Sequence, residues 1–141
     1  MSRLPVLLLV GALACGGGES SGTRVVASTA GDPVAGKAAI AKYGCGSCHT
    51  IPGVARARGL VGPPLTDFAQ RSYIAGRAYN TPANLEAWIR VPDSVEPGTA
   101  MPTLGVSRED ARNITAYLYL ETATRELGPP HLLPATLLPK E

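Results

Sequence analysis

Two cysteines and a histidine stand within five residues of this sequence. Cys45 and Cys48 are separated by two residues, and His49 directly follows the second cysteine in CGSCH. Positions i, i+3 and i+4 of a helical turn share one face, so all three side chains can face one flat object. Haem is such an object, because two thiols one turn apart reach its vinyl groups while the imidazole reaches the iron. C-x-x-C-H is the attachment signature of c-type haem.

Two other chemistries use cysteines at this spacing. A thioredoxin-like redox pair normally lies at a strand-to-helix junction within alternating strands and helices, and this sequence shows no such alternation. A zinc site needs four ligands, and besides Cys45, Cys48 and His49 the chain offers only Cys15 and His131. We therefore favour haem attachment over both alternatives.

A haem iron with one histidine ligand has either an open sixth site or a second protein ligand, often a thioether sulfur. Met1 belongs to the N-terminal segment, so Met101 is the remaining methionine of the chain. Pro92, Pro97 and Pro102 surround it, and prolines restrict the backbone. A lone methionine is usually core packing. Next to an upstream CGSCH, we instead expect Met101 to be the sixth ligand, held in a stiff loop.

The elements that must position these residues are predicted to be helical. Asp32 and Pro33 are typical of an N-cap and a first turn, and helical spacing continues to the cysteines. Ser107, followed three residues later by Asp110, resembles a capping box at the start of a final helix. We predict an all-α domain with three to five helices around one covalent haem, joined by long Pro/Gly-rich loops.

Length and charge limit the alternatives. The 141 residues suffice for one small domain. A hydrophobic fraction of 45% and a charged fraction of 17% are ordinary for a globular protein. The net charge is only +2, and no run of five basic residues occurs, so we expect no nucleic-acid binding.

The N-terminus is predicted to be an export signal. Residues 1–14 carry Arg3, an apolar stretch too short to span a bilayer, and small residues before Cys15. This region resembles a lipoprotein signal with Cys15 as the lipidated residue, although Ala12 replaces the commonest leucine. Ordinary signal cleavage is the alternative, and it would leave Cys15 as a free thiol. Residues 15–31 have the Gly/Ser-rich composition of a flexible tether to a membrane surface.

Five segments in this order resemble a class I, mono-haem cytochrome c, and most closely the cytochrome c domain fused to subunit II of some bacterial haem-copper oxidases. The segments are CGSCHTIPG, GLVGPPLTDFAQRSYIAG, NTPANLEAWI, EPGTAMP and SREDARNITAYLYL. The resemblance covers residues 32–125 and leaves a Pro/Leu-rich tail, 126–141. The sequence shows no copper-binding segment and no transmembrane helix, so we expect a free-standing carrier of this domain type.

The resemblance implies further roles around the haem. Pro63 matches the proline whose carbonyl accepts a hydrogen bond from the ligand histidine, here His49. Trp88 matches an aromatic residue that lines the pocket on the sulfur side. Arg71 and Tyr73 are candidates for contacting the haem propionates, because buried carboxylates need donors. A simple turn, core packing and solvent exposure are the ordinary roles of these residue types.

The resemblance also implies one helix contact. In cytochromes of this class, the first and last helices cross where a glycine admits an aromatic side chain. Gly36 and Tyr117 fit this pair, because glycine permits a close approach.

An iron with imidazole and thioether ligands is coordinatively saturated, which favours electron transfer over oxygen chemistry. We expect a single-electron carrier, not an enzyme, that exchanges electrons with a quinol-oxidising complex and a terminal oxidase. It would be exported to the periplasm or the outer face of a membrane, anchored by lipid on Cys15. The alternatives are a haem sensor whose Met101 leaves the iron, and a dedicated electron-transfer subunit of a periplasmic oxidoreductase. Arg56 and Arg58 can attract acidic partners, although a solvated loop is their simpler interpretation.

Overall fold

The computed structural model describes residues 29–127. Four α-helices, two short 3-10 helices and one pair of strands make up this part of the chain: α2 (Pro33–Lys42), η1 (Cys45–Ser47), η2 (Phe68–Gln70), β1 (Tyr73–Ile74), β2 (Ala78–Tyr79), α3 (Pro82–Arg90), α4 (Pro92–Val95) and α5 (Arg108–Leu127). The domain is mainly helical, as predicted, and the antiparallel β1–β2 hairpin is an addition to the predicted all-α fold. The predicted export signal, the lipidated Cys15 and His131 lie outside the described residues. Within 29–127, none of the helices combines the length and apolar character needed to cross a bilayer.

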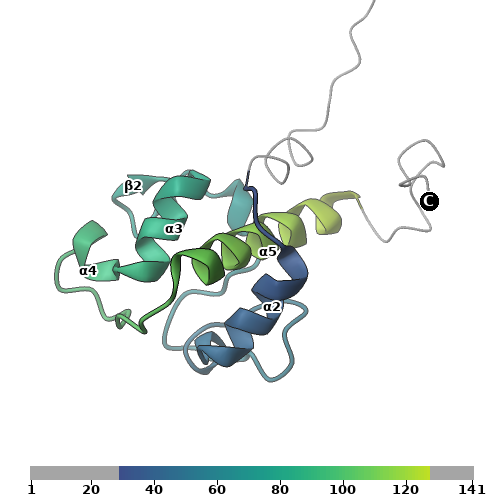
Figure 1. The fold of residues 1–141 in the computed structure, drawn as a ribbon, viewed down its shortest axis with the longest axis horizontal. Helices are drawn as coiled ribbons and strands as arrows, with labels where there is room; N and C mark the ends of the chain where they lie inside the picture. Colours follow the sequence, from purple (N-terminus) through teal and green to yellow (C-terminus); the bar gives the residue numbers. More distant parts are fainter. Residues whose placement is uncertain (1–28, 128–141) are drawn as a thin grey trace, which may run out of the picture.

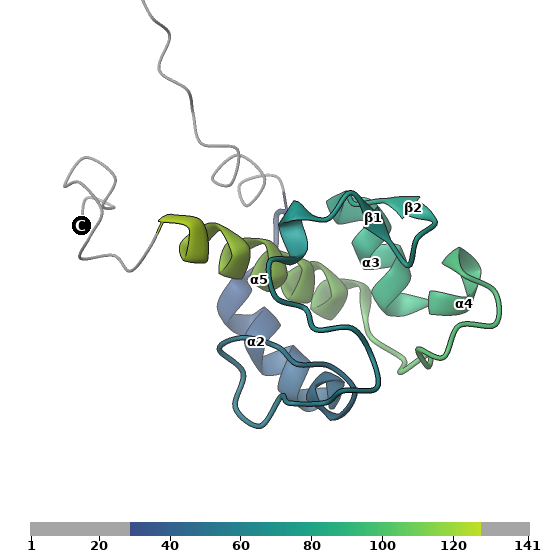
Figure 2. The same cartoon turned by 180° about the vertical axis from the view of Figure 1, so that it is seen from behind.

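Helix α5 runs through the middle of the domain, with α2 crossing it on one side and α3 on the other (Figures 1 and 2). Asp32 caps α2 as predicted: its carboxylate accepts hydrogen bonds from the Val34 and Ala35 amides, at 2.8 and 3.3 Å. The contact between α2 and α5 is the most extensive between two elements of the described chain. This crossing therefore forms the frame on which the loops are built.

Gly36 lies at the crossing, where a methyl group would collide with the Asn113 carbonyl oxygen. The atoms nearest to the glycine belong to the backbone of Asn113 and Ile114, so Gly36 permits a close approach of the two helix backbones. The Tyr117 hydroxyl donates to the Pro52 carbonyl at 2.6 Å. The pairing of Gly36 with the Tyr117 ring stays a prediction.

A polar cluster joins the end of α2 to the start of α5. The Ser107 hydroxyl accepts a hydrogen bond from the Asp110 amide at 3.0 Å, as the predicted capping box requires. The Asp110 carboxylate accepts from the Tyr43 hydroxyl at 2.7 Å and from the Lys42 ammonium at 3.1 Å. These two donors lower the pKa of Asp110.

A series of hydrogen bonds connects the β1–β2 hairpin region to α5. The Tyr119 hydroxyl donates to the Asn80 side-chain oxygen at 2.8 Å, and the side-chain nitrogen of Asn80 donates to the Phe68 backbone carbonyl at 2.8 Å. Burial raises the pKa of Tyr119 to about 12. Asn80 directly follows β2, so these two hydrogen bonds fix the position of the hairpin relative to α5.

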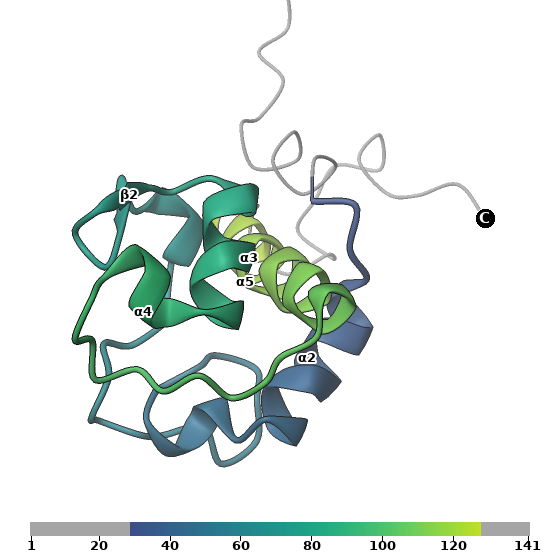
Figure 3. The same cartoon turned by 60° about the vertical axis from the view of Figure 1, so that its left-hand side comes forward.

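The apolar core lies between α2, α3 and α5. All three helices contribute large buried apolar side chains to it: Ile40, Leu85, Ile114 and Leu118. Figure 3 shows the segment between α4 and α5 crossing the face of the domain, with α3 and α4 on one side and the η1 region on the other. The core thus has one side covered by loops alone, and the candidate site lies there.

Candidate haem site

The CGSCH motif forms a tight turn just beyond α2, as its position predicts. Cys45 begins η1, and the His49 amide donates to the Cys45 carbonyl at 3.0 Å. A second stretch, residues 59–65, lies along this turn. Its amides at Gly59, Gly62 and Leu65 donate to the carbonyls of Gly46, Cys48 and Thr50, at 3.1, 2.8 and 2.8 Å. Backbone hydrogen bonds therefore hold the whole motif in place.

The imidazole of His49 has one defined orientation. Its Nδ1 lies 2.7 Å from the Pro63 carbonyl oxygen, which is the contact that the resemblance implied. A carbonyl can only accept, so Nδ1 carries the hydrogen and Nε2 keeps its lone pair. Gly62 lies against the ring, and a β-carbon there would stand 2.6 Å from Nδ1. The glycine and the proline together fix the position of the ring, and Nε2 is the nitrogen left to act as a metal ligand.

Met101 lies in the loop between α4 and α5, residues 96–106, which we call the Met101 loop. The Gly98 amide donates to the Asp93 carboxylate at 2.9 Å, and the Met101 amide donates to the Thr99 hydroxyl at 3.3 Å. The Thr99 amide donates to the Glu96 carbonyl at 3.1 Å. These bonds span at most five residues, so they shape the loop without attaching it to the rest of the domain.

His49 and Met101 both line three cavities, which we treat together as the central cavity. The largest of the three measures about 350 Å³. Cys45 and Cys48 line one end, and Trp88 lies between two of the three spaces. One of the three spaces has an almost wholly apolar wall, which comes from α2, α3, α5 and two loops: Ile40, Leu65, Leu85, Ile89, Leu104, Val106, Ile114 and Leu118. The largest space also borders the polar side chains of Arg71, Glu96 and Thr99.

Sequence reasoning did not name these wall residues as part of the site. The signal was present in α3, where Leu85, Trp88 and Ile89 recur at helical spacing. Periodicity identifies such residues as apolar and inward-facing. It does not distinguish packing against another helix from packing against a cofactor.

The donor set fits haem c. Two thiols stand at one edge of an apolar space, and the space is lined by an imidazole with a free lone pair and by a thioether sulfur. Burial raises the pKa of the Cys45 thiol, whereas redox-active C-x-x-C thiols are activated by a lowered pKa. Cys45 and Cys48 are not joined in a disulfide. Among the described residues, no three His, Cys, Asp or Glu side chains form a group able to hold a bare metal ion.

The two propionate candidates lie in different places. Arg71 lines the central cavity, donates to the carbonyls of Pro64 and Thr66, and covers the Phe68 ring at 5.2 Å. A guanidinium has five N–H groups, so donors remain for an anion. Tyr73 is 50% exposed and stacks on Tyr79 with ring centres 5.2 Å apart. It is not among the residues that line the cavity, so the structure does not bring it to this site.

Comparison with known proteins places this architecture in a family. The Cytochrome c family model matches residues 33–119. The cytochrome c oxidase subunit 2 of Alkalihalophilus pseudofirmus is 39% identical over 84 residues, which cover 59% of this chain and 24% of that protein. The corresponding subunit of a Bacillus species is 37% identical over 92 residues, covering 62% of this chain and 26% of that protein. That of Bacillus subtilis is 33% identical over 79 residues, 55% of this chain and 22% of that protein.

The chain therefore spans about a quarter of the length of the curated relatives that it matches. The predicted relationship to the cytochrome c domain of oxidase subunit II is confirmed by these matches. The chain belongs to the cytochrome c family, and it is an electron-transfer cytochrome by that membership.

Proposed function

We propose that this cytochrome carries single electrons in a respiratory chain and donates them to a terminal oxidase. The observation that carries the proposal is that His49 and Met101 line one cavity with both cysteines at its edge. Bound haem would supply an iron that changes its charge by one electron. With the imidazole nitrogen of His49 and the sulfur of Met101 both bound, this iron would have no open position for oxygen.

The residues of the chain have separate tasks in this proposal. Cys45 and Cys48 would hold the haem covalently through their sulfur atoms, and His49 Nε2 and the Met101 sulfur would ligate its iron. The Pro63 carbonyl keeps the imidazole in the ligating tautomer. The apolar wall excludes water, which favours the less charged ferrous state and raises the reduction potential. Trp88 closes part of that wall, and Arg71 supplies donors for a propionate.

A terminal oxidase is proposed as acceptor because the relatives are named cytochrome c oxidase subunit 2. The electron donor would be a quinol-oxidising complex, and the protein would work outside the cytoplasm, tethered through lipid on Cys15. Leu60 and Val61 are 89% and 82% exposed, directly before the Gly62 that covers His49. Together with the exposed Arg56 and Arg58, they offer an apolar and basic surface for brief contact with redox partners.

The test uses the protein made in a host that attaches c-type haem. Haem staining of a denaturing gel is expected for the wild type and not for a Cys48→Ser variant. The oxidised wild type should show a sulfur-to-iron absorption band near the red end of the spectrum. The reduced protein should not bind carbon monoxide.

The Met101→Ala variant is expected to lose the red band and to bind carbon monoxide. Leu104→Ala is the matched control, because Leu104 also lines the cavity but offers no ligand. A red band that survives in Met101→Ala would contradict the proposed ligand. Carbon monoxide binding by the wild type would favour a sensor over a carrier.

A further inference from the structure

The Met101 loop has few polar attachments to the rest of the domain, although Val106 near its end belongs to the apolar core. Its backbone hydrogen bonds reach only to Asp93, Pro92 and other members of the loop. Among the hydrogen bonds and ion pairs of the described residues, one alone joins residues 96–106 to a distant segment. This is the pair between Glu96 and Arg77, nineteen positions apart in the sequence.

The pair has the geometry of a two-point clamp. Arg77 Nε donates to one carboxylate oxygen of Glu96, and a second guanidinium nitrogen donates to the other oxygen at 3.3 Å. Such bidentate pairs fix direction as well as distance. The Glu96 side chain is only 28% exposed, whereas that of Arg77 is 64% exposed. The neighbouring carboxylate raises the pKa of Arg77.

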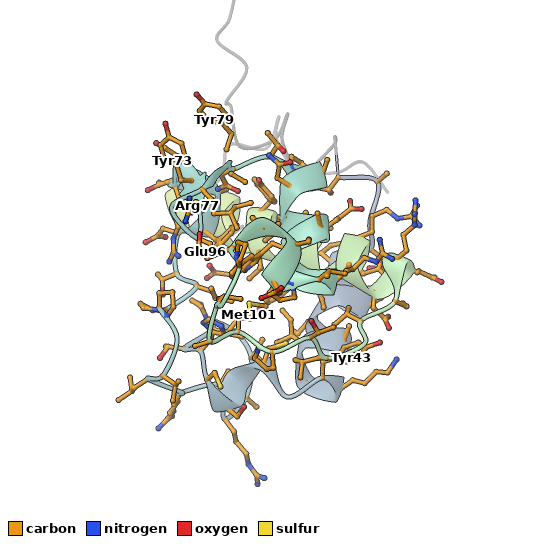
Figure 4. The ribbon with its side chains drawn as sticks, turned by 90° about the vertical axis from the view of Figure 1, so that its left-hand side faces the viewer. Tyr43, Tyr73, Arg77, Tyr79, Glu96 and Met101 are labelled. Atoms are coloured by element: carbon orange, nitrogen blue, oxygen red, sulfur yellow. The ribbon has the colours of Figure 1, made fainter. Side chains whose placement is uncertain are left out.

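Arg77 itself stands on a well-anchored element. It closes the β1–β2 turn, where its amide donates to the Ile74 carbonyl at 3.0 Å. The register of the hairpin pairs Tyr73 with Tyr79, and Asn80 then binds α5 through Tyr119. In Figure 4, Arg77 and Glu96 lie between the two hairpin tyrosines and Met101.

The clamp joins two walls of the central cavity. Ala75, at the tip of the hairpin, lines the same 350 Å³ space as Glu96, Thr99 and Met101. We infer that Arg77 is a positioning residue, which holds the Met101 loop against the hairpin and so keeps the Met101 sulfur at the haem iron. This inference rests on the proposed role of Met101 as axial ligand. A thioether is a weak ligand, so the persistence of its bond depends on how firmly its loop is held.

The experiment measures how easily an added ligand displaces Met101 in the oxidised holoprotein. Imidazole is the probe, and loss of the red band reports its binding. Arg77→Gln is expected to raise the affinity for imidazole roughly 1.5- to fivefold, the range for a partly exposed ion pair. Glu96→Gln should do the same. The double variant should bind imidazole no more tightly than either single variant, because both substitutions remove the same interaction.

Three controls separate positioning from general stability. Lys37→Gln removes an exposed cation elsewhere, on α2, and should leave the imidazole affinity unchanged. Arg77→Lys keeps the charge without the two-point geometry, so its affinity for imidazole should lie between those of the wild type and Arg77→Gln. Raising the salt concentration should increase imidazole affinity in the wild type but not in Arg77→Gln.

The outcomes distinguish the two proposals. If Met101→Ala abolishes the red band but Arg77→Gln binds imidazole like the wild type, the inference is overturned and the proposed ligand stands. Strictly additive effects of the Arg77→Gln and Glu96→Gln substitutions would also overturn it. A wild type without any red band would overturn both.

Discussion

The two sides of the central cavity are held in different ways. On the histidine side, three backbone hydrogen bonds and the Pro63 carbonyl attach the motif to residues 59–65. On the methionine side, short-range bonds shape the loop, and one partly exposed ion pair attaches it to the hairpin. Backbone bonds are little affected by salt, whereas an exposed ion pair is screened. From this difference we expect the proposed Met101 ligand, and not the His49 imidazole, to be displaced first under stress.

The largest expected effect comes from breaking the histidine side. In Gly62→Ala, the new methyl group would collide with the imidazole ring, and the neighbouring backbone bond to Cys48 prevents retreat. We expect a loss of roughly 2–3 kcal/mol in the free energy of unfolding, as for other overpacked sites. Denaturant titration of the holoprotein measures it.

Gly76→Ala is the control for this substitution. A β-carbon at Gly76 would meet open space, although the backbone φ of 70° is unfavourable for alanine. Its cost should be about 1 kcal/mol. If Gly62→Ala is no more costly than Gly76→Ala, the histidine side is less rigid than the comparison requires.

The next effect concerns the anchor of the hairpin that carries Arg77. Tyr119→Phe leaves the Asn80 oxygen without its donor and should cost about 1–2 kcal/mol. The pKa of Tyr119 is raised to about 12, so the folded state disfavours ionisation of its hydroxyl. The contribution of Tyr119 to the free energy of unfolding is therefore fully present below the unfolded pKa of about 10, and it is lost as the pH rises toward 12.

Unfolding measured between pH 9 and 12 should therefore show a smaller loss of stability in Tyr119→Phe than in the wild type. Tyr73→Phe is the matched control, because Tyr73 is half exposed on the hairpin. The prediction fails if the two variants have the same pH profile.

A smaller effect is expected at the Tyr43 cluster, which lies on the opposite side of Met101 from the Arg77–Glu96 pair in the view of Figure 4. Tyr43→Phe removes a part-buried hydrogen bond to Asp110 and should cost about 1 kcal/mol. Tyr43 and Lys42 lower the pKa of Asp110 in the folded protein. The contribution of Asp110 to the free energy of unfolding is therefore present above the ordinary carboxyl pKa of about 4, and it is lost as the pH falls through the lower pKa of the folded state. When unfolding is measured at decreasing pH, the free energy of unfolding should fall less steeply in Tyr43→Phe than in the wild type. An unchanged acid profile would contradict this role of Tyr43.

The smallest effect sharpens the comparison directly. Thr99→Val removes the acceptor of the Met101 amide at a half-buried loop position and should lower global stability by about 0.5 kcal/mol, the low end for a single hydrogen bond. Hydrogen exchange of the Met101 amide should become faster, while the amides of Gly62 and Leu65 keep their wild-type rates. Faster exchange on the histidine side as well would show that the two sides are not independent.

Much of the site was predictable because its chemistry is local in the sequence. The C-x-x-C-H spacing brings two thiols and an imidazole to one turn without any distant contact. The caps at Asp32 and Ser107 are likewise local, and both were predicted and confirmed. The Met101 loop was recognised by its prolines and by elimination among two methionines.

The sequence by itself therefore determined the helical framework, the haem-type motif and the residues able to ligate iron, because each depends on spacing within a few positions. Only the tertiary structure decided that Gly62 supports the imidazole, that Gly36 meets the backbone of Asn113, that Tyr73 lies away from the cavity and that Arg77 clamps Glu96. Each of these contacts joins residues at least thirteen positions apart or depends on which way a short hairpin faces. Many folds of the chain satisfy the same local pattern, and only the packing of α2, α3 and α5 selects one set of distant neighbours.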